Sequence, residues 1–211
     1  MAEEISIIVL AAGESRRMGQ PKLLLPWGGS TVLGQVVATL AAGVAMERVP
    51  DFQLKNDWEI VVVTGGAREP VETLVVELAK EYLVRSVYNS DYANSGMLGS
   101  IQAGLRALGL DTGPALIALG DQPQVQEKTV RGIYTAYLQT RSPLVIPSFQ
   151  KRRGHPWLVN RSLWPEILSL PASTTPRQFL DRHKGQIVYV PANESILQDL
   201  DTPEDYIRLR P

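Results

Sequence analysis

Short apolar runs of strand length alternate along the chain with longer amphipathic stretches of helical periodicity. The apolar runs predict buried strands over 5–10, 59–64, 84–88, 114–119 and 144–147. The longer stretches between them predict helices over 30–42, 69–82, 95–108 and 126–140, the third with Ser95 as its cap. Strands that alternate with helices in this way are typical of a parallel sheet covered by helices on both faces.

The last third of the chain is less regular. Strands are expected over 156–159 and 187–190, with short helices between them. A final helix is expected to begin with Thr202 as N-cap, Pro203 in its first turn and Asp205 three residues after the cap, which is a capping-box pattern. The polar stretch 48–56 is expected to be a surface insertion. Together these elements predict an α/β protein, a Rossmann-like three-layer sandwich with a mostly parallel central sheet.

Length and composition narrow the class further. The 211 residues suggest a single domain over 1–211. The 21 basic and 22 acidic residues nearly balance, which argues against a nucleic-acid partner. The chain has no cysteine and two histidines, so any metal is expected to be a hard cation on carboxylates: Mg²⁺, Mn²⁺ or Ca²⁺. An acidic start and the lack of a long apolar segment lead us to expect a cytoplasmic protein with no membrane partner.

Ligands of open α/β sheets bind beyond the carboxyl ends of the strands, so we expect the binding residues to lie in the loops that follow the strands. The first loop follows Leu10 with the small residues Ala11, Ala12 and Gly13, which let a ligand approach the backbone closely. Successive backbone N–H groups in such a turn can cradle phosphate oxygens. Arg17 and Lys22 in the same loop add positive charge and hydrogen-bond donors.

Known phosphate-binding signatures do not fit this loop. Five residues separate Gly13 from Gly19, which excludes the P-loop, and the dinucleotide-binding glycine pattern is absent. The alternative interpretation of the loop is a surface turn with solvated basic residues.

Acidic residues occur at two further points. Asp121 directly follows the predicted strand 114–119, where it could cap a helix or coordinate Mg²⁺ between phosphates. Asp199 and Asp201 project to the same side if their segment is extended, so either could supply a second metal ligand. The sequence leaves the choice between them open.

Two other segments have both a structural and a functional interpretation. The helix start near Ser95 offers free N–H groups to an anion or a base edge, but simple capping explains it as well. The run from Lys151 to Arg153 resembles an ordinary solvated surface. We expect these basic neighbours to disfavour the charged form of His155, which would then act as a hydrogen-bonding group.

Taken together, these segments resemble the molybdenum cofactor cytidylyltransferase family, within the MobA-like nucleotidyltransferases. The resemblance covers nearly the whole chain, in order, and rests on the segments 10–27, 63–65, 89–92, 96–100, 120–123, 153–156 and 199–206. It implies the fold of the nucleotide-diphospho-sugar transferases. It also implies transfer of CMP from CTP to the phosphate of molybdopterin, with release of pyrophosphate.

The resemblance assigns a role to each group of residues. Lys22, Arg17 and Asp121 would be catalytic, and Asp121 with Asp201 or Asp199 would hold Mg²⁺, with Mn²⁺ as the alternative. The nucleotide would bind the residues Leu10, Ala11, Ala12, Gly13, Ser15, Arg17, Lys22, Thr64, Gly65 and Ser100. The molybdopterin side would be formed by Gln122, Pro123, Gly154, His155 and Pro156.

Several alternatives stay open from the sequence. Ala12 and Pro21 stand where the guanylyl branch usually has Gly and Asp, which favours CTP over GTP. The other candidates are a guanylyltransferase, a sugar- or lipid-phosphate nucleotidyltransferase, and a non-catalytic factor that delivers the cofactor to a molybdoenzyme acceptor. An NAD-dependent oxidoreductase is disfavoured by the missing dinucleotide fingerprint.

Overall fold

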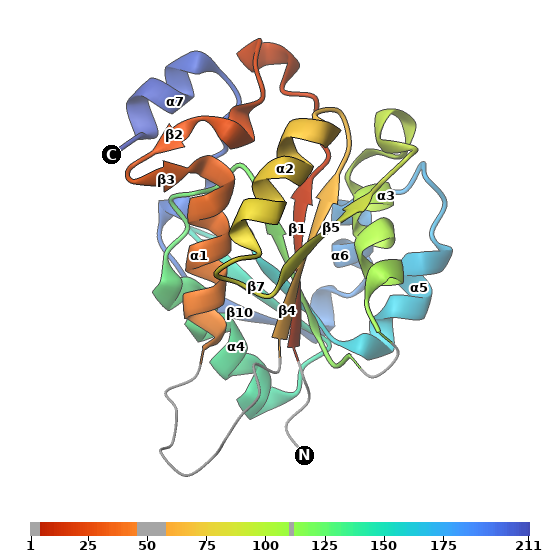
Figure 1. Ribbon diagram of the computed structural model, residues 1–211. Coiled ribbons are helices and arrows are strands. Elements are labelled where there is room, and N and C mark those ends of the chain that lie inside the picture. The colour runs from red at the N-terminus through yellow and green to blue at the C-terminus, as the bar shows by residue number, and fades with distance from the viewer. Residues whose placement is uncertain (1–4, 46–57, 110–111) are drawn as a thin grey trace.

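A mostly parallel sheet lies at the centre of the protein in the computed structural model, which describes residues 5–45, 58–109 and 112–211 (Figure 1). The strand order is β10-β7-β9-β6-β1-β4-β5, with β8 paired to β7. The predicted insertion 48–56 lies outside the described residues. The strands of this sheet are β1 (Ile5–Ala11), β4 (Trp58–Thr64), β5 (Val84–Tyr88), β6 (Ala115–Leu119), β7 (Leu144–Phe149), β8 (Arg152–Arg153), β9 (Trp157–Val159) and β10 (Ile187–Pro191).

Strand β9 runs antiparallel between β6 and β7. The reason is the short connection: β7 ends at Phe149 and β9 begins at Trp157. A parallel crossover needs a dozen or more residues, so the chain can only turn back on itself here. The remaining pairings among the long strands are parallel, which confirms the predicted fold class.

Helices cover both faces of the sheet. One face carries α1 (Val32–Val44), α2 (Arg68–Leu78) and α4 (Glu127–Thr140), and the other carries α3 (Tyr92–Ala107), α5 (Trp164–Ser169) and α6 (Pro176–Arg182). Strand β1 serves both cores, because Ile7 and Val9 pack on the first face while Ile8 packs on the second. Alternation along a strand buried on both faces explains its continuous apolar run.

Short 3₁₀ turns and a small hairpin follow β1. The 3₁₀ turns are η1 (Arg16–Met18) and η2 (Lys22–Leu24), and the hairpin pairs β2 (Pro26–Trp27) with β3 (Ser30–Thr31). Helix α1 therefore begins slightly later than predicted, because the hydroxyl of Thr31 accepts a hydrogen bond from the N–H of Gly34 and caps it. Further 3₁₀ turns are η3 (Arg161–Leu163), η4 (Lys184–Gln186) and η5 (Glu194–Leu197).

The expected role of Ser95 as the cap of α3 is wrong. The helix begins at Tyr92, and Gly96 breaks it with a left-handed φ of 56°. The hydroxyl of Ser95 donates to the carbonyl of Asp91 and accepts from the side-chain amide of Asn89. Asn89 also accepts from the N–H of Asp91, so its side chain organises the turn that starts the helix earlier.

The final helix α7 (Pro203–Leu209) forms as predicted, with a complete capping box between Thr202 and Asp205. It lies beside the β2–β3 hairpin (Figure 1), where the hydroxyl of Tyr206 donates to the carbonyl of Pro26 and its ring packs near Trp27. This contact holds the C-terminal segment at the carboxyl edge of the sheet. In the part of the chain that is described, no helix has the length and apolarity needed to cross a membrane.

Candidate active site

Two carboxylates converge on one lysine at the carboxyl edge of the sheet. Lys22 Nζ lies 2.5 Å from Asp121 Oδ2 and 3.4 Å from Asp201 Oδ1. Arg17 adds a second cation, with its Nη2 2.9 Å from Asp201 Oδ2. The side chains of Lys22 and Asp121 are largely buried, at 13% and 20% exposure, so water screens their attraction less than it would at the surface.

The C-terminal segment joins this cluster through its backbone. The N–H of Leu200 donates to the carbonyl of Asp121 across 3.2 Å, and the Leu200 side chain is fully buried in the core. Gln122 Nε2 donates to Asp199 Oδ1 across 2.7 Å. Asp199 and Asp201 thus both reach the site, as expected, but they have different partners.

Asp199 stands in an acidic environment. Desolvation by the surrounding protein raises the pKa of Asp199 although the residue keeps contact with solvent, and the charges of Asp121 and Asp201 raise this pKa further. The hydrogen bond from Gln122 and the charge of Lys22 act in the opposite direction. The cluster therefore carries more negative charge than Lys22 neutralises.

A cavity of about 390 Å³ opens over these carboxylates. Its lining includes seven residues named from the sequence: Leu10, Ala12, Gly13, Ser100, Asp121, Asp199 and Asp201. Tyr92 and Met97 also line it, and sequence reasoning missed both of them. The segment that contains them follows a predicted strand. The sequence does not show that the helix breaks at Gly96, between these two residues.

Some predicted nucleotide-binding residues lie behind the cavity wall. Ala11 and Thr64 are buried, and the Thr64 hydroxyl donates to Glu72 Oε1. Gly65 lies against the backbone of Ala12 so closely that a Cβ there would come within 2.4 Å of the Ala12 carbonyl oxygen. Among the described contacts, Thr64 and Gly65 shape the wall from behind rather than line it.

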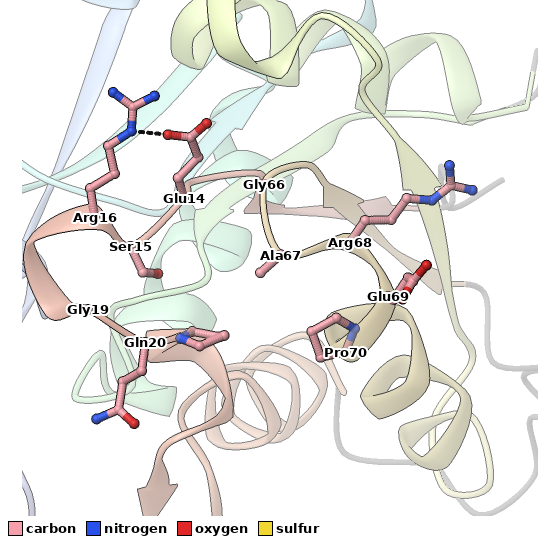
Figure 2. A pocket seen from close by; sticks show the side chains of 11 residues that line it. Glu14, Ser15, Arg16, Gly19, Gln20, Gly66, Ala67, Arg68, Glu69 and Pro70 are labelled. Carbon is pink, nitrogen blue, oxygen red and sulfur yellow. Dashed lines mark hydrogen bonds and ion pairs between the residues drawn. The ribbon is translucent and has the colours of Figure 1, made fainter.

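A second, larger cavity lies between the Glu14–Pro21 loop and the start of α2. It measures about 590 Å³, and Figure 2 shows the loop residues on one side of it and residues 66–70 on the other. Ser15 lines this second cavity rather than the acidic one, and its hydroxyl accepts from the N–H of Lys22. Arg16 pairs with Glu14 at the edge of the loop.

The residues predicted to contact molybdopterin are mostly buried. Gln122, Pro123, Gly154 and Pro156 are all inaccessible or nearly so. Gly154 packs against Ile196, where a Cβ would come within 2.3 Å of the Ile196 carbonyl oxygen. The same carbonyl accepts from Gln122 Nε2, so Gly154 and Gln122 meet through Ile196.

His155 stacks on the ring of Trp157, with 4.3 Å between ring centroids. Burial lowers the pKa of His155 to about 3, so its ring is neutral at physiological pH. The cause of this lowered pKa is desolvation and not the basic neighbours on which the expectation rested. Arg153, the nearest of these neighbours in sequence, pairs with Asp181 and Tyr189.

The acidic cluster is an incomplete cation site by itself. Within the described ranges, no three acidic or histidine side chains gather closely enough to hold a metal ion. Lys22 occupies the space between Asp121 and Asp201. This donor set fits Mg²⁺, which usually binds one or two carboxylates and completes its shell with water and substrate phosphates.

The α/β fold, with a mostly parallel sheet and a cluster of carboxylates and cations at its carboxyl edge, matches a family of nucleotidyltransferases. The chain belongs to the family of the MobA-like NTP transferase domain, whose model matches residues 7–187.

Individual relatives support this membership over nearly the full length. The chain is 29% identical to the molybdenum cofactor cytidylyltransferase of Escherichia coli over 96% of this chain and 94% of the relative. It is 30% identical to the nicotine blue oxidoreductase of Paenarthrobacter nicotinovorans, with the same coverage of each chain. A nucleotidyl transferase of solved structure from Methanothermobacter (Mth528) is 28% identical to this chain and superposes on it with a TM-score of 0.73, covering 99% of this chain and 97% of that one.

Proposed function

We propose that this protein is a cytidylyltransferase that moves CMP from CTP to the phosphate of molybdopterin and releases pyrophosphate. The observation that carries the proposal is the contact of Lys22 with both Asp121 and Asp201 beside the glycine-containing loop. A lysine that neutralises two carboxylates in the free protein can exchange them for phosphate oxygens. The carboxylates then become available to a divalent cation that arrives with the nucleotide.

The residues divide the work of an in-line transfer. Lys22 and Arg17 neutralise the triphosphate and the departing pyrophosphate, while Asp121 and Asp201 or Asp199 hold the metal. When bound, the metal would neutralise the negative charge that develops between the α-phosphate of the nucleotide and the acceptor phosphate. An oxygen of the acceptor phosphate bonds to the α-phosphorus, and the bond from that phosphorus to the β-phosphate oxygen breaks. No side chain forms a covalent intermediate.

Nucleotide choice is assigned to the wall of the 390 Å³ cavity. Leu10 and Ala12 offer a close approach for the base, and Tyr92 and Met97 add apolar surface to the same cavity wall. We assign CTP as the donor because Ala12 and Pro21 differ from the guanylyl pattern. The similarity to the cytidylyltransferase of E. coli supports the same choice.

The acceptor phosphate is assigned to the other end of the site. Gly154 packs against Ile196, whose carbonyl accepts from Gln122, and the neutral ring of His155 follows Gly154 directly in the chain. Because Gln122 and Gly154 are buried, we assign them to supporting this surface. We expect the physiological setting to be the cytoplasm, with a molybdoenzyme as the final acceptor.

Pyrophosphate release tests the proposal. The purified protein is supplied with CTP or GTP and Mg²⁺ or Mn²⁺, with and without purified molybdopterin. Release with CTP that depends on molybdopterin supports the proposal. Asp121→Ala should abolish it, whereas the control Glu77→Ala, which removes an exposed carboxylate on α2, should leave it unchanged.

Other outcomes separate the remaining alternatives. Preference for GTP indicates the guanylyl activity, and turnover with sugar or lipid phosphates indicates that class of acceptor. Tight nucleotide binding without turnover indicates a delivery factor. Because one relative of this chain is named an oxidoreductase, oxidation of NADH or NADPH is measured in the same preparation. Absence of any CTP-dependent release contradicts the proposal.

A further inference from the structure

We propose that Gln122 is a positioning residue: its side-chain amide fixes the carboxylate of Asp199, so that two segments distant in sequence form one cation site. This inference rests on the proposed function, because it concerns the metal that the transfer would use. It replaces the expectation that Gln122 contacts the second substrate.

The first support is the burial of Gln122. Its side chain is only 4% exposed, so it cannot offer its amide to a substrate in the open cavity. Its Nε2 instead donates twice to the C-terminal segment, to Asp199 Oδ1 across 2.7 Å and to the carbonyl of Ile196 across 3.4 Å. These partners lie 77 and 74 positions further along the chain.

The second support is the way in which the C-terminal segment is attached. The backbone of Leu200 bonds to Asp121, and the side-chain amide of Gln124 donates to the carbonyl of Gln198. These contacts fix the backbone of the segment but not the carboxylate of Asp199. Gln122 acts on that carboxylate directly, and it comes from the residue next to Asp121.

The third support is electrostatic. Asp199 faces the negative charges of Asp121 and Asp201, which favour rotation of its carboxylate toward solvent. A neutral amide opposes this rotation with a hydrogen bond but leaves the full negative charge on Asp199. A lysine in the same place would neutralise the charge that a cation needs. Groups that orient metal-binding side chains in this way commonly change metal affinity by about 10- to 100-fold when they are removed.

The test compares four single variants and one double variant by Mn²⁺ binding, measured by electron paramagnetic resonance with CTP present. Gln122→Met keeps the volume of the side chain and removes the donor. Gln122→Asn keeps an amide that is one methylene too short to reach Asp199, and it serves if the first variant does not fold. Gln126→Ala is the control, because Gln126 is exposed and makes no capping hydrogen bond. Asp199→Ala removes the proposed partner.

We expect Gln122→Met and Gln122→Asn to weaken Mn²⁺ binding at least about tenfold, and Gln126→Ala to leave it unchanged. Combined with Asp199→Ala, Gln122→Met should cause no further loss, because a positioning residue has nothing left to position. Wild-type Mn²⁺ affinity in both Gln122 variants would overturn the inference, as would additive losses in the double variant or a lack of Mn²⁺ binding by the wild type.

Pyrophosphate release is measured on the same proteins. Transfer by the wild type together with unaltered Mn²⁺ affinity in the Gln122 variants overturns the inference and leaves the proposed function standing. If the wild type shows no transfer but the Gln122 variants lose Mn²⁺ affinity as expected, the proposed function is contradicted and the inference about Gln122 stands.

Discussion

Lys22 and Asp121 form an ion pair at the carboxyl edge of the sheet although 99 positions separate them in sequence. The pair joins the loop after β1 to the loop after β6, and these two strands are neighbours in the sheet. The pair therefore connects Lys22, the phosphate-binding candidate, to Asp121, the metal-binding candidate in the loop after β6.

Lys22→Ala should lower the rate of pyrophosphate release by a factor of about 10² or more, in line with the loss of one electrostatic donor in a catalytic site. Without the ammonium group, Asp121 loses its ion-pair partner, Asp201 keeps only Arg17, and the triphosphate loses one of the two proposed cations. The measurement is steady-state release from CTP. Lys80→Ala, which removes an exposed lysine on the surface, is the matched control. A change below about threefold would show that Lys22 has no part in the transfer.

Gly13→Ala should separate ligand approach from folding. A Cβ at this position meets no atom within 4 Å, so the variant should unfold at nearly the wild-type temperature. The methyl group would nevertheless project beside the lining of the acidic cavity. We expect CTP to bind at least several-fold more weakly, as measured by calorimetry. Gly29→Ala, whose Cβ also meets nothing, should bind CTP normally. Unchanged CTP affinity in Gly13→Ala would place the nucleotide elsewhere.

Gly154→Ala should destabilise the protein. Its Cβ would overlap Ile196, whose carbonyl also accepts from Gln122, so the turn has to shift. Overpacking of this kind costs about 1–3 kcal/mol of the free energy of unfolding. Chemical denaturation measures the loss, with Gly185→Ala as the control because its Cβ meets no atom within 4 Å. Equal stability of the two variants would contradict the close packing of Gly154.

His155 should make stability depend on pH. Burial lowers its folded-state pKa to about 3, below the ordinary value of about 6.5 that the unfolded chain has. The unfolded chain therefore binds a proton that the folded protein does not, so stability falls as the pH falls below about 6.5. Between pH 7 and pH 5 the contribution is on the order of 1–2 kcal/mol.

The measurement is the free energy of unfolding at both pH values for the wild type and for His155→Gln. The variant cannot titrate at this position, whereas His183 is present in both proteins and cancels. The wild type should lose more stability than the variant between pH 7 and pH 5. The same pH dependence in both would show that His155 is not buried in its neutral form.

Local patterns in the sequence were enough for much of the fold and part of the site. Continuous apolar runs predicted the parallel strands, because a strand covered on both faces needs apolar side chains at every position. The capping box at Thr202 was readable because its groups lie within four residues. Loops at the carboxyl ends of strands contained Gly13 and Asp121, and both line the acidic cavity.

Tertiary contacts decided how strand β9 is placed in the sheet and which hydrogen-bond partners the site residues have. Strand β9 is antiparallel because the short turn before it returns the chain along β7. Thr64 ends β4 at the same edge of the sheet as the other candidates, yet its hydroxyl donates to the half-buried carboxylate of Glu72. The pairing of β9 with β6 and the partner of the Thr64 hydroxyl have no local signal, because each depends on which distant element packs alongside.

The acidic cluster shows the same division most clearly. The sequence by itself determined that Asp121, Asp199 and Asp201 were the candidates, since the chain has no cysteine and two histidines for any other metal chemistry. Only the tertiary structure shows that Asp201 forms ion pairs with Lys22 and Arg17, whereas Asp199 accepts a hydrogen bond from Gln122. Residues two positions apart can point toward one cavity, but their partners come from loops about 80 to 180 positions away. The packing of those loops, and not the local spacing, decides which charge meets which donor.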